Sequence, residues 1–259
     1  MTGTARYMYA ITRSLPPGQL SGTVGIDGGS LETVEHRGLV AVVSEVDLAE
    51  YDEEALHQNL ERMDWLEKVA RSHDEVIQAV AAVAPVAPLR LATICLDDDG
   101  VRARLDEWHD GLKQALDRVE GCREWSVKVI APPVESTKPV AKPASGADYL
   151  RSKKENARAH AVAEQTLVNT GEEVHAALTE GLVDGIGGVV VASRRLSPQD
   201  PRLSGHRGTM LLNGAYLVET SAADAFEEAV SALAGDHPEV IVECGGPWPP
   251  YSFATLEET

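Results

Sequence analysis

The chain has 259 residues, with 23 Lys and Arg against 41 Asp and Glu, which gives a formal net charge of −18. This negative charge repels phosphate groups and argues against a general nucleic-acid binder or a protein that docks on anionic lipid. A hydrophobic content of 43% allows a packed core and argues against global disorder. No apolar run reaches the roughly 20 residues of a membrane span, and no secretory signal is present. We therefore expect a cytoplasmic protein.

A proline-rich segment divides the chain. Residues 132–146, PPVESTKPVAKPASG, contain four of the 14 prolines, and proline favours extended backbone without amide donors. The sequence predicts a first domain over 1–131, a linker over 132–146, a second domain over 147–246 and a C-terminal tail over 247–259.

The first half predicts short strands and two long helices. The apolar steps of three and four after Asp52 predict one helix that runs to Pro85. The aspartates at 97–99 predict the cap of a second helix, which Gly121 ends. The Arg37-Gly38 dipeptide predicts a hairpin turn. Strands are expected at Tyr7–Ile11, Val24–Ile26, Leu31–His36, Leu39–Val43, Leu89–Ile94 and Trp125–Ile130.

The second half predicts a helix from about Tyr149 to Leu178 and a shorter one with Phe226, Val230 and Leu233 on its inner face. Ser221 and Asp224 resemble a capping box for the shorter helix. Strands are expected at Ile186–Ser193, Thr209–Val218 and Val240–Glu243. The fold class is therefore α+β, with two antiparallel sheets that helices cover on one face. The second domain suits a ferredoxin-like arrangement with one strand missing or contributed from elsewhere.

The usual catalytic and cofactor motifs are missing from the sequence. It contains no Walker A loop, no G-x-S-x-G elbow and no H-E-x-x-H pair. Cys95, Cys122 and Cys244 are far apart, which argues against a zinc site or a disulfide framework. Residues 97–99 could attract a hard cation, but their spacing favours helix capping. We therefore expect no catalytic residues, no metal and no cofactor.

Two segments are candidates for contacts. Arg90 lies between Leu89 and Leu91, so it either points outward or pairs with a carboxylate, and a ligand or partner contact is the alternative. The tail holds three aromatic residues on a proline-rich backbone, which loses little entropy when it is immobilised. It folds back onto the chain or serves as an anchor for a partner, and the two outcomes are not exclusive. The candidate partner-binding residues are Arg90, Thr93, Trp248, Tyr251 and Phe253.

Five segments in series resemble the GvpF/GvpL family of gas vesicle proteins. The most specific is the tail motif GPWPPYSF at residues 246–253. In the expected order, the others are YMYA at 7–10, PLRLAT at 88–93, GADYL at 146–150 and LLNGAYLV at 211–218. The chain departs from the family pattern Arg-Phe-Gly-Thr, because Leu91 and Ala92 replace the aromatic residue and the glycine.

The resemblance implies a minor, non-enzymatic gas vesicle protein with two α+β domains. Such a protein would bind the hydrophobic shell subunit GvpA and other minor gas vesicle proteins, and would prevent aggregation of the subunit during nucleation of the vesicle. Sheet-edge pairing and aromatic contacts could shield the subunit, and the negative charge would keep the complex soluble. The alternatives are an α+β enzyme that uses Arg90 with a carboxylate, or a small-molecule sensor domain.

Overall fold

The computed structural model describes residues 3–133, 146–180, 189–199 and 208–254. Their contacts group into two compact units. Unit 1 comprises the described residues of Met1–Glu124 and Pro247–Thr259, and unit 2 those of Trp125–Gly246. The tail therefore groups with the first half of the chain. The expected linker lies mostly outside the described residues, since these stop at 133 and resume at 146.

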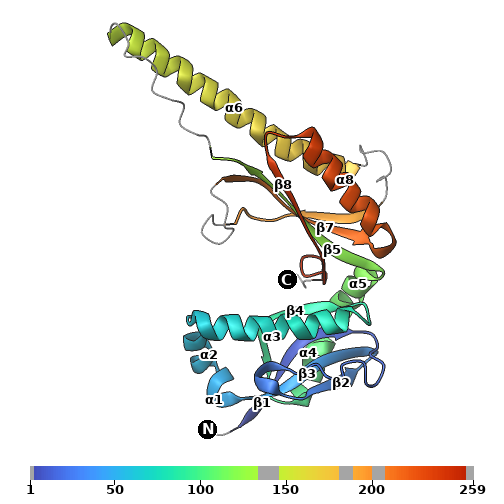
Figure 1. The fold of residues 1–259 in the computed structure, drawn as a ribbon. Coiled ribbons are helices and arrows are strands. Elements are labelled where there is room, and N and C mark those ends of the chain that lie inside the picture. Colours follow the sequence, from blue (N-terminus) through green and yellow to red (C-terminus); the bar gives the residue numbers. More distant parts are fainter. Residues whose placement is uncertain (1–2, 134–145, 181–188, 200–207, 255–259) are drawn as a thin grey trace. The chain divides into compact units, whose positions relative to one another are not determined.

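Unit 1 contains an antiparallel sheet of four strands (Figure 1). Its order is β2-β3-β1-β4. The predicted hairpin is confirmed, because Arg37 and Gly38 join two of the strands with φ of 49° and 76°. Both values suit the tight turn that a twisted hairpin requires. The strands are β1 (Thr4–Thr12), β2 (Leu31–His36), β3 (Leu39–Asp47) and β4 (Ala87–Cys95).

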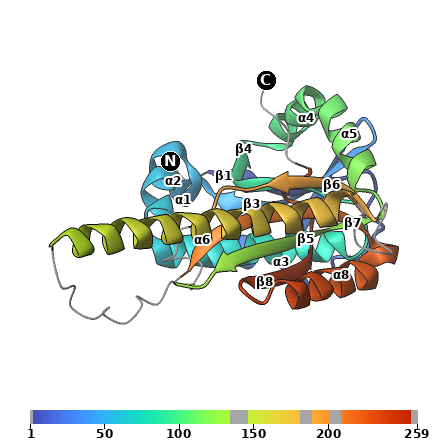
Figure 2. The same ribbon diagram turned by 90° about the horizontal axis from the view of Figure 1, so that it is seen from above.

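Helices cover both faces of this sheet, whereas one covered face was expected (Figures 1 and 2). Tyr7 and Tyr9 belong to a core cluster with α3, while Arg6, on the opposite face of β1, bonds to Asp98 of α4. Both faces can be covered because β1 is a nearly continuous apolar run, and its residues are buried on both faces. One layer contains α1 (Leu48–Tyr51), α2 (Glu53–Leu60) and α3 (Met63–Ala81), and the other contains α4 (Asp98–Glu107) and α5 (His109–Val119).

Each long helix expected in the first half is broken. Arg62 has extended backbone between α2 and α3, and Trp108 leaves helical geometry between α4 and α5. Met63 is one of the apolar residues whose spacing after Asp52 predicted a single helix, but it is 72% exposed because the break reorients the helix start. The predicted cap is confirmed, since Asp97 accepts a hydrogen bond from the Gly100 amide.

The expected strand at Val24–Ile26 is a short 3-10 turn at Ile26–Gly28 instead. The Tyr9 hydroxyl accepts a 2.8 Å hydrogen bond from the Ile26 amide and thereby holds this turn against β1. Gly25 permits the close approach, because a Cβ atom there would lie 2.6 Å from the same hydroxyl oxygen. The hydrogen bond to Tyr9 therefore stabilises a turn at Ile26–Gly28, where a strand was expected.

The second sheet has the order β6-β7-β5-β8. In chain order its elements run β-α-β-β-α-β, and with this strand order they form the ferredoxin-like fold that was expected. The strand thought to be missing is β5, which precedes residues 132–146 and which sequence analysis placed in the first domain. The elements are β5 (Cys122–Ala131), α6 (Gly146–Glu180), β6 (Val190–Arg195), β7 (Thr209–Glu219), α8 (Ala223–Asp236) and β8 (Ile241–Trp248).

The start of α8 differs from the predicted capping box. Ala222 occupies the cap position with no side-chain hydrogen bond, because the 3-10 turn Thr220–Ala222 precedes the helix. The inner face is confirmed, since Phe226, Val230 and Leu233 are buried. Across the described part of the chain, the helices are too short or too polar to span a membrane.

Candidate functional site

The edge strand β4 contains a wide bulge. Met8 pairs with Thr93 and Ala10 with Pro88, so the four residues 89–92 lie opposite Tyr9 alone. Ala92 has a φ of 62°, which L-amino acids with a side chain rarely adopt. Arg90 lies in this bulge and its side chain is exposed. We refer to residues 89–92 as the β4 bulge.

A buried hydrogen-bond chain fixes the β4 bulge on both sides of Arg90. The Ala92 amide donates to the Tyr7 hydroxyl at 2.9 Å, and this hydroxyl lies 3.1 Å from His73 Nδ1. His73 Nε2 lies 3.1 Å from the Leu89 carbonyl oxygen. Because a carbonyl only accepts, Nε2 carries the proton, and Nδ1 accepts from Tyr7. Burial lowers the pKa of His73, so the imidazole is neutral at neutral pH.

Thr93 contributes to the shape of the bulge. Its Oγ1 donates a 2.7 Å hydrogen bond to the Arg90 carbonyl oxygen, which closes a turn at the end of the bulge. Arg90 and Thr93 are the two predicted contact residues on β4. Arg90 is exposed at the surface, whereas the Thr93 hydroxyl bonds to the backbone of the bulge.

The three aromatic residues of the tail are placed differently. Trp248, the last residue of β8, is 46% exposed. Phe253 is 3% exposed, and Tyr251 packs against the core cluster of unit 1. The tail therefore folds back onto unit 1, which is one of the two expected outcomes.

Three polar groups of unit 1 hold the tail. Tyr251 donates a 2.6 Å hydrogen bond to Asp74 Oδ1 on α3. The Glu124 carboxylate accepts from the Ser252 amide at 2.7 Å and from the Ser252 hydroxyl at 2.6 Å. Arg118 donates to the Phe253 carbonyl oxygen at 3.3 Å. These bonds hold residues 251–253, which follow Trp248 after Pro249 and Pro250.

Helix α3 thus links two segments that sequence analysis treated separately. His73 bonds to the β4 bulge and its neighbour Asp74 bonds to the tail. Neither residue was predicted from the sequence. One signal was available for His73, because it lies four residues after Val69 and four before Ile77 and so shares the apolar stripe. Asp74 and Glu124 gave no such signal.

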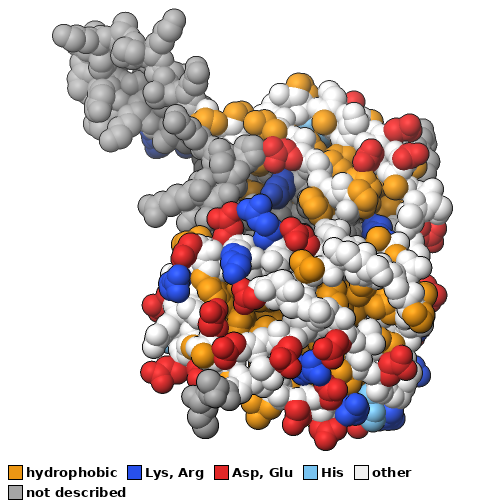
Figure 3. Space-filling view, turned by 60° about the horizontal axis from the view of Figure 1, so that its bottom comes forward, with side chains coloured by type: hydrophobic (Ala, Val, Ile, Leu, Met, Phe, Trp, Pro, Cys, Tyr) orange, Lys and Arg blue, Asp and Glu red, His pale blue; other side chains and the backbone are white. Residues whose placement is uncertain are grey.

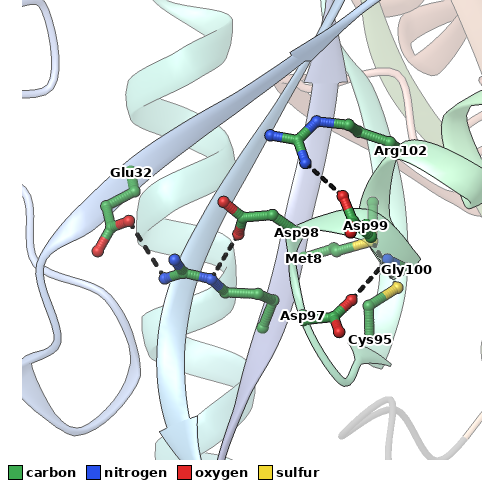
Figure 4. Close-up of polar contacts among 9 residues, drawn as sticks. Met8, Glu32, Cys95, Asp97, Asp98, Asp99, Gly100 and Arg102 are labelled. Carbon is green, nitrogen blue, oxygen red and sulfur yellow. Dashed lines mark hydrogen bonds and ion pairs between the residues drawn. The ribbon is translucent and has the colours of Figure 1, made fainter.

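The aspartates at 97–99 have separate partners (Figure 4). Asp97 caps α4, Asp98 accepts a 2.8 Å bond from Arg6 Nε, and Asp99 pairs with Arg102 at 2.7 Å. The Arg6 guanidinium also lies 3.2 Å from a Glu32 oxygen. The three carboxylates thus contact three different groups and share no common centre. Among the residues that the structure describes, none form a group of three or more His, Cys, Asp or Glu suited to a metal ion.

The segments that form the β4 bulge and the tail also carry the family resemblance. The family model for gas vesicle synthesis protein GvpL/GvpF matches residues 5–255. The chain belongs to the GvpL/GvpF family. Its role is therefore related to gas vesicles.

Individual relatives agree with this assignment. The chain is 40% identical over 264 residues to gas vesicle protein L of Streptomyces sp. strain CB03234, with 99% of the chain and 95% of that protein covered. It is 24% identical to gas vesicle protein F2 of Halobacterium salinarum, with 86% of the chain and 80% of that protein covered.

Solved structures confirm the fold. The crystal structure of GvpF from Anabaena sp. PCC7120 matches with a TM-score of 0.66 and 18% identity, covering 99% of this chain and 98% of that one. GvpF from Microcystis aeruginosa matches with a TM-score of 0.65 and 18% identity, covering 97% and 99%. The two-domain α+β architecture of this GvpL/GvpF protein is therefore shared with both GvpF structures.

Proposed function

We propose that this GvpL/GvpF protein assists gas vesicle assembly by binding the hydrophobic shell subunit GvpA and limiting its aggregation. The observation that carries the proposal is Trp248, a large aromatic side chain that is 46% exposed on an anchored backbone. Pro247 and Pro249 flank it, and after Pro250 the residues Tyr251, Ser252 and Phe253 are bonded to unit 1. An aromatic anchor that is already ordered loses little entropy on binding.

In this proposal the tail residues have different roles. Trp248 contacts the partner, while Tyr251 and Phe253 hold the tail against unit 1. Arg90, exposed in the β4 bulge, is a second contact for the same class of partner. The net charge of −18 helps to keep a complex with an apolar subunit in solution, and Figure 3 shows carboxylates interspersed with apolar side chains on the face in view.

The test is light scattering of GvpA freshly diluted from denaturant, followed by co-purification. The parent protein should suppress scattering and be captured with GvpA. Trp248→Ala should weaken capture by about 30-fold, the loss of a typical aromatic anchor. Met63→Ala is the matched control, since Met63 is an apolar side chain that is 72% exposed and that we do not place in the contact.

Two results would contradict the proposal. If the parent protein neither suppresses scattering nor is captured, GvpA is not its partner. If folded Trp248→Ala retains the capture level of the parent, Trp248 is not the anchor. Circular dichroism of each variant separates loss of the contact from loss of the fold.

A further inference from the structure

The β4 bulge is held by a buried histidine. The backbone on the two sides of Arg90 is held by His73, directly through the Leu89 carbonyl and indirectly through Tyr7 and the Ala92 amide. His73 is 5% exposed and Tyr7 is fully buried. The protein therefore fixes the conformation of an exposed edge segment from inside its core.

We propose that His73 is a pH-sensitive switch that holds the β4 bulge closed when the imidazole is neutral and releases it when the imidazole is protonated. The inference goes beyond the assembly role and does not depend on the identity of any partner. Its basis is the direction of each hydrogen bond in the chain from Ala92 to Leu89.

Protonation reverses one of these bonds. Nδ1 of neutral His73 accepts from the Tyr7 hydroxyl, whereas Nδ1 of the imidazolium carries a proton and can only donate. The Tyr7 oxygen would then receive hydrogens from both His73 and Ala92, and its own O–H would lose its acceptor. A buried donor without a partner and a buried positive charge are both unfavourable. Opening of the bulge relieves both, because water reaches the imidazolium.

The surroundings of His73 provide little compensation for the charge. From β1, Tyr9 stacks on the imidazole ring with centroids 5.7 Å apart. The Tyr7 ring is inclined at 71° to the imidazole, with centroids 5.6 Å apart. From β4, the group in contact is the Leu89 carbonyl. Asp74 on α3 favours the charged form of His73, but its carboxylate accepts a hydrogen bond from the Tyr251 hydroxyl. Burial outweighs both the Leu89 hydrogen bond and Asp74, since the pKa of His73 is lowered overall.

The pH range of the switch is set by the pKa of His73 in the closed and in the open bulge. An open bulge exposes His73 to water and restores a pKa near 6.5, above that of the closed state. Between these two values the equilibrium constant for opening rises about tenfold for each pH unit of acidification. Above pH 7.5 the bulge should be closed and insensitive to pH.

The experiment is amide hydrogen exchange of the full chain, followed at residues 89–93 and corrected for the intrinsic exchange rate. Protection should fall by up to about fivefold between pH 6.5 and 5.5. His73→Gln is the decisive variant, because its amide offers an acceptor for Tyr7 and a donor for Leu89 but does not titrate. Its bulge protection should be independent of pH. His175→Gln is the matched control, since His175 lies 2.8 Å from the Tyr216 hydroxyl in unit 2. It should keep the parental response.

Two outcomes would overturn the proposal. One is a constant protection of residues 89–93 in the parent across this pH range. The other is the same pH response in folded His73→Gln as in the parent. If His73→Gln does not fold, nitrogen-15 NMR of the parent decides. A proton on Nε2 and a titration midpoint below 6.5 support the switch, and a proton on Nδ1 at neutral pH refutes it. Neither readout uses GvpA, so failure here is distinct from failure of the proposed function.

Discussion

The phenol of Tyr251 donates a 2.6 Å hydrogen bond to Asp74, which joins the C-terminal tail to α3 across 177 sequence positions. The ring of Tyr251 packs on the same core cluster as Tyr7 and Tyr9. Burial, and then the bond to Asp74, raise the pKa of Tyr251, so the hydroxyl keeps its proton far above neutral pH. The tail is therefore part of the folded structure of unit 1.

Removal of the Tyr251 hydroxyl should destabilise the protein. Tyr251→Phe keeps the ring but leaves the part-buried Asp74 without its donor, which should lower the free energy of unfolding by about 1–3 kcal/mol. Urea denaturation measures this change. Asp74→Ala and the double variant complete a cycle, and single-variant effects that add within about 0.5 kcal/mol would show that the bond contributes nothing.

The Glu124 carboxylate should control how firmly the tail is held. It is 8% exposed and accepts two hydrogen bonds from Ser252. Glu124→Gln replaces one acceptor oxygen by a donor, so exchange of the Ser252 amide should accelerate about 10-fold or more. Glu120→Gln is the control, because Glu120 is 62% exposed and pairs with Arg13. Equal exchange rates at Ser252 in both variants would refute a holding role for Glu124.

Ala92 should be a site where glycine stabilises the chain. A φ of 62° is costly for alanine by about 1–2 kcal/mol, and glycine adopts it without strain. After the greater entropy of an unfolded glycine is subtracted, Ala92→Gly should raise the free energy of unfolding by about 0.5–1 kcal/mol. Ala87→Gly on the same strand should lower it. A loss of stability in both variants would contradict the strained conformation.

Alkaline pH should unfold the protein through its tyrosines. Burial raises the pKa of Tyr7, Tyr9, Tyr51, Tyr216 and Tyr251. A raised pKa in the folded state contributes stability below the unfolded value near 10, and this stability is lost as pH rises above it. Absorbance at 295 nm should show that these groups ionise together with loss of circular dichroism. Ionisation near pH 10 with an unchanged spectrum would contradict their burial.

Local signals in the sequence predicted much of the fold. The Arg37-Gly38 turn, the Asp97 cap and the inner face of α8 depend on neighbouring residues, and all three were confirmed. The turn at Ile26 was not predictable in this way, because the Tyr9 hydroxyl that holds it lies 17 positions away. The assignment of β5 to the second sheet likewise depends on pairing with strands later in the chain.

The candidate site was predicted only where residue type alone is informative. The aromatic and proline content of the tail indicated an anchor, and Arg90 stood out within an apolar strand. The sequence did not show that Tyr251 and Phe253 are enclosed while Trp248 is exposed, since Asp74 and Glu124 are ordinary acidic residues in an acidic chain. Which acidic residue meets the tail is decided by tertiary packing.

The return of the tail to unit 1 affects how the protein folds during its synthesis. Tyr251 and Phe253 are made long after β4, with which the sheet of unit 1 is complete. At ordinary translation rates the interval is on the order of ten seconds. During this interval the nascent first half lacks contacts that the finished protein has. Ribosome-bound chains that end before the tail should therefore hold a less stable N-terminal unit, which is completed once residues 251–253 have been made.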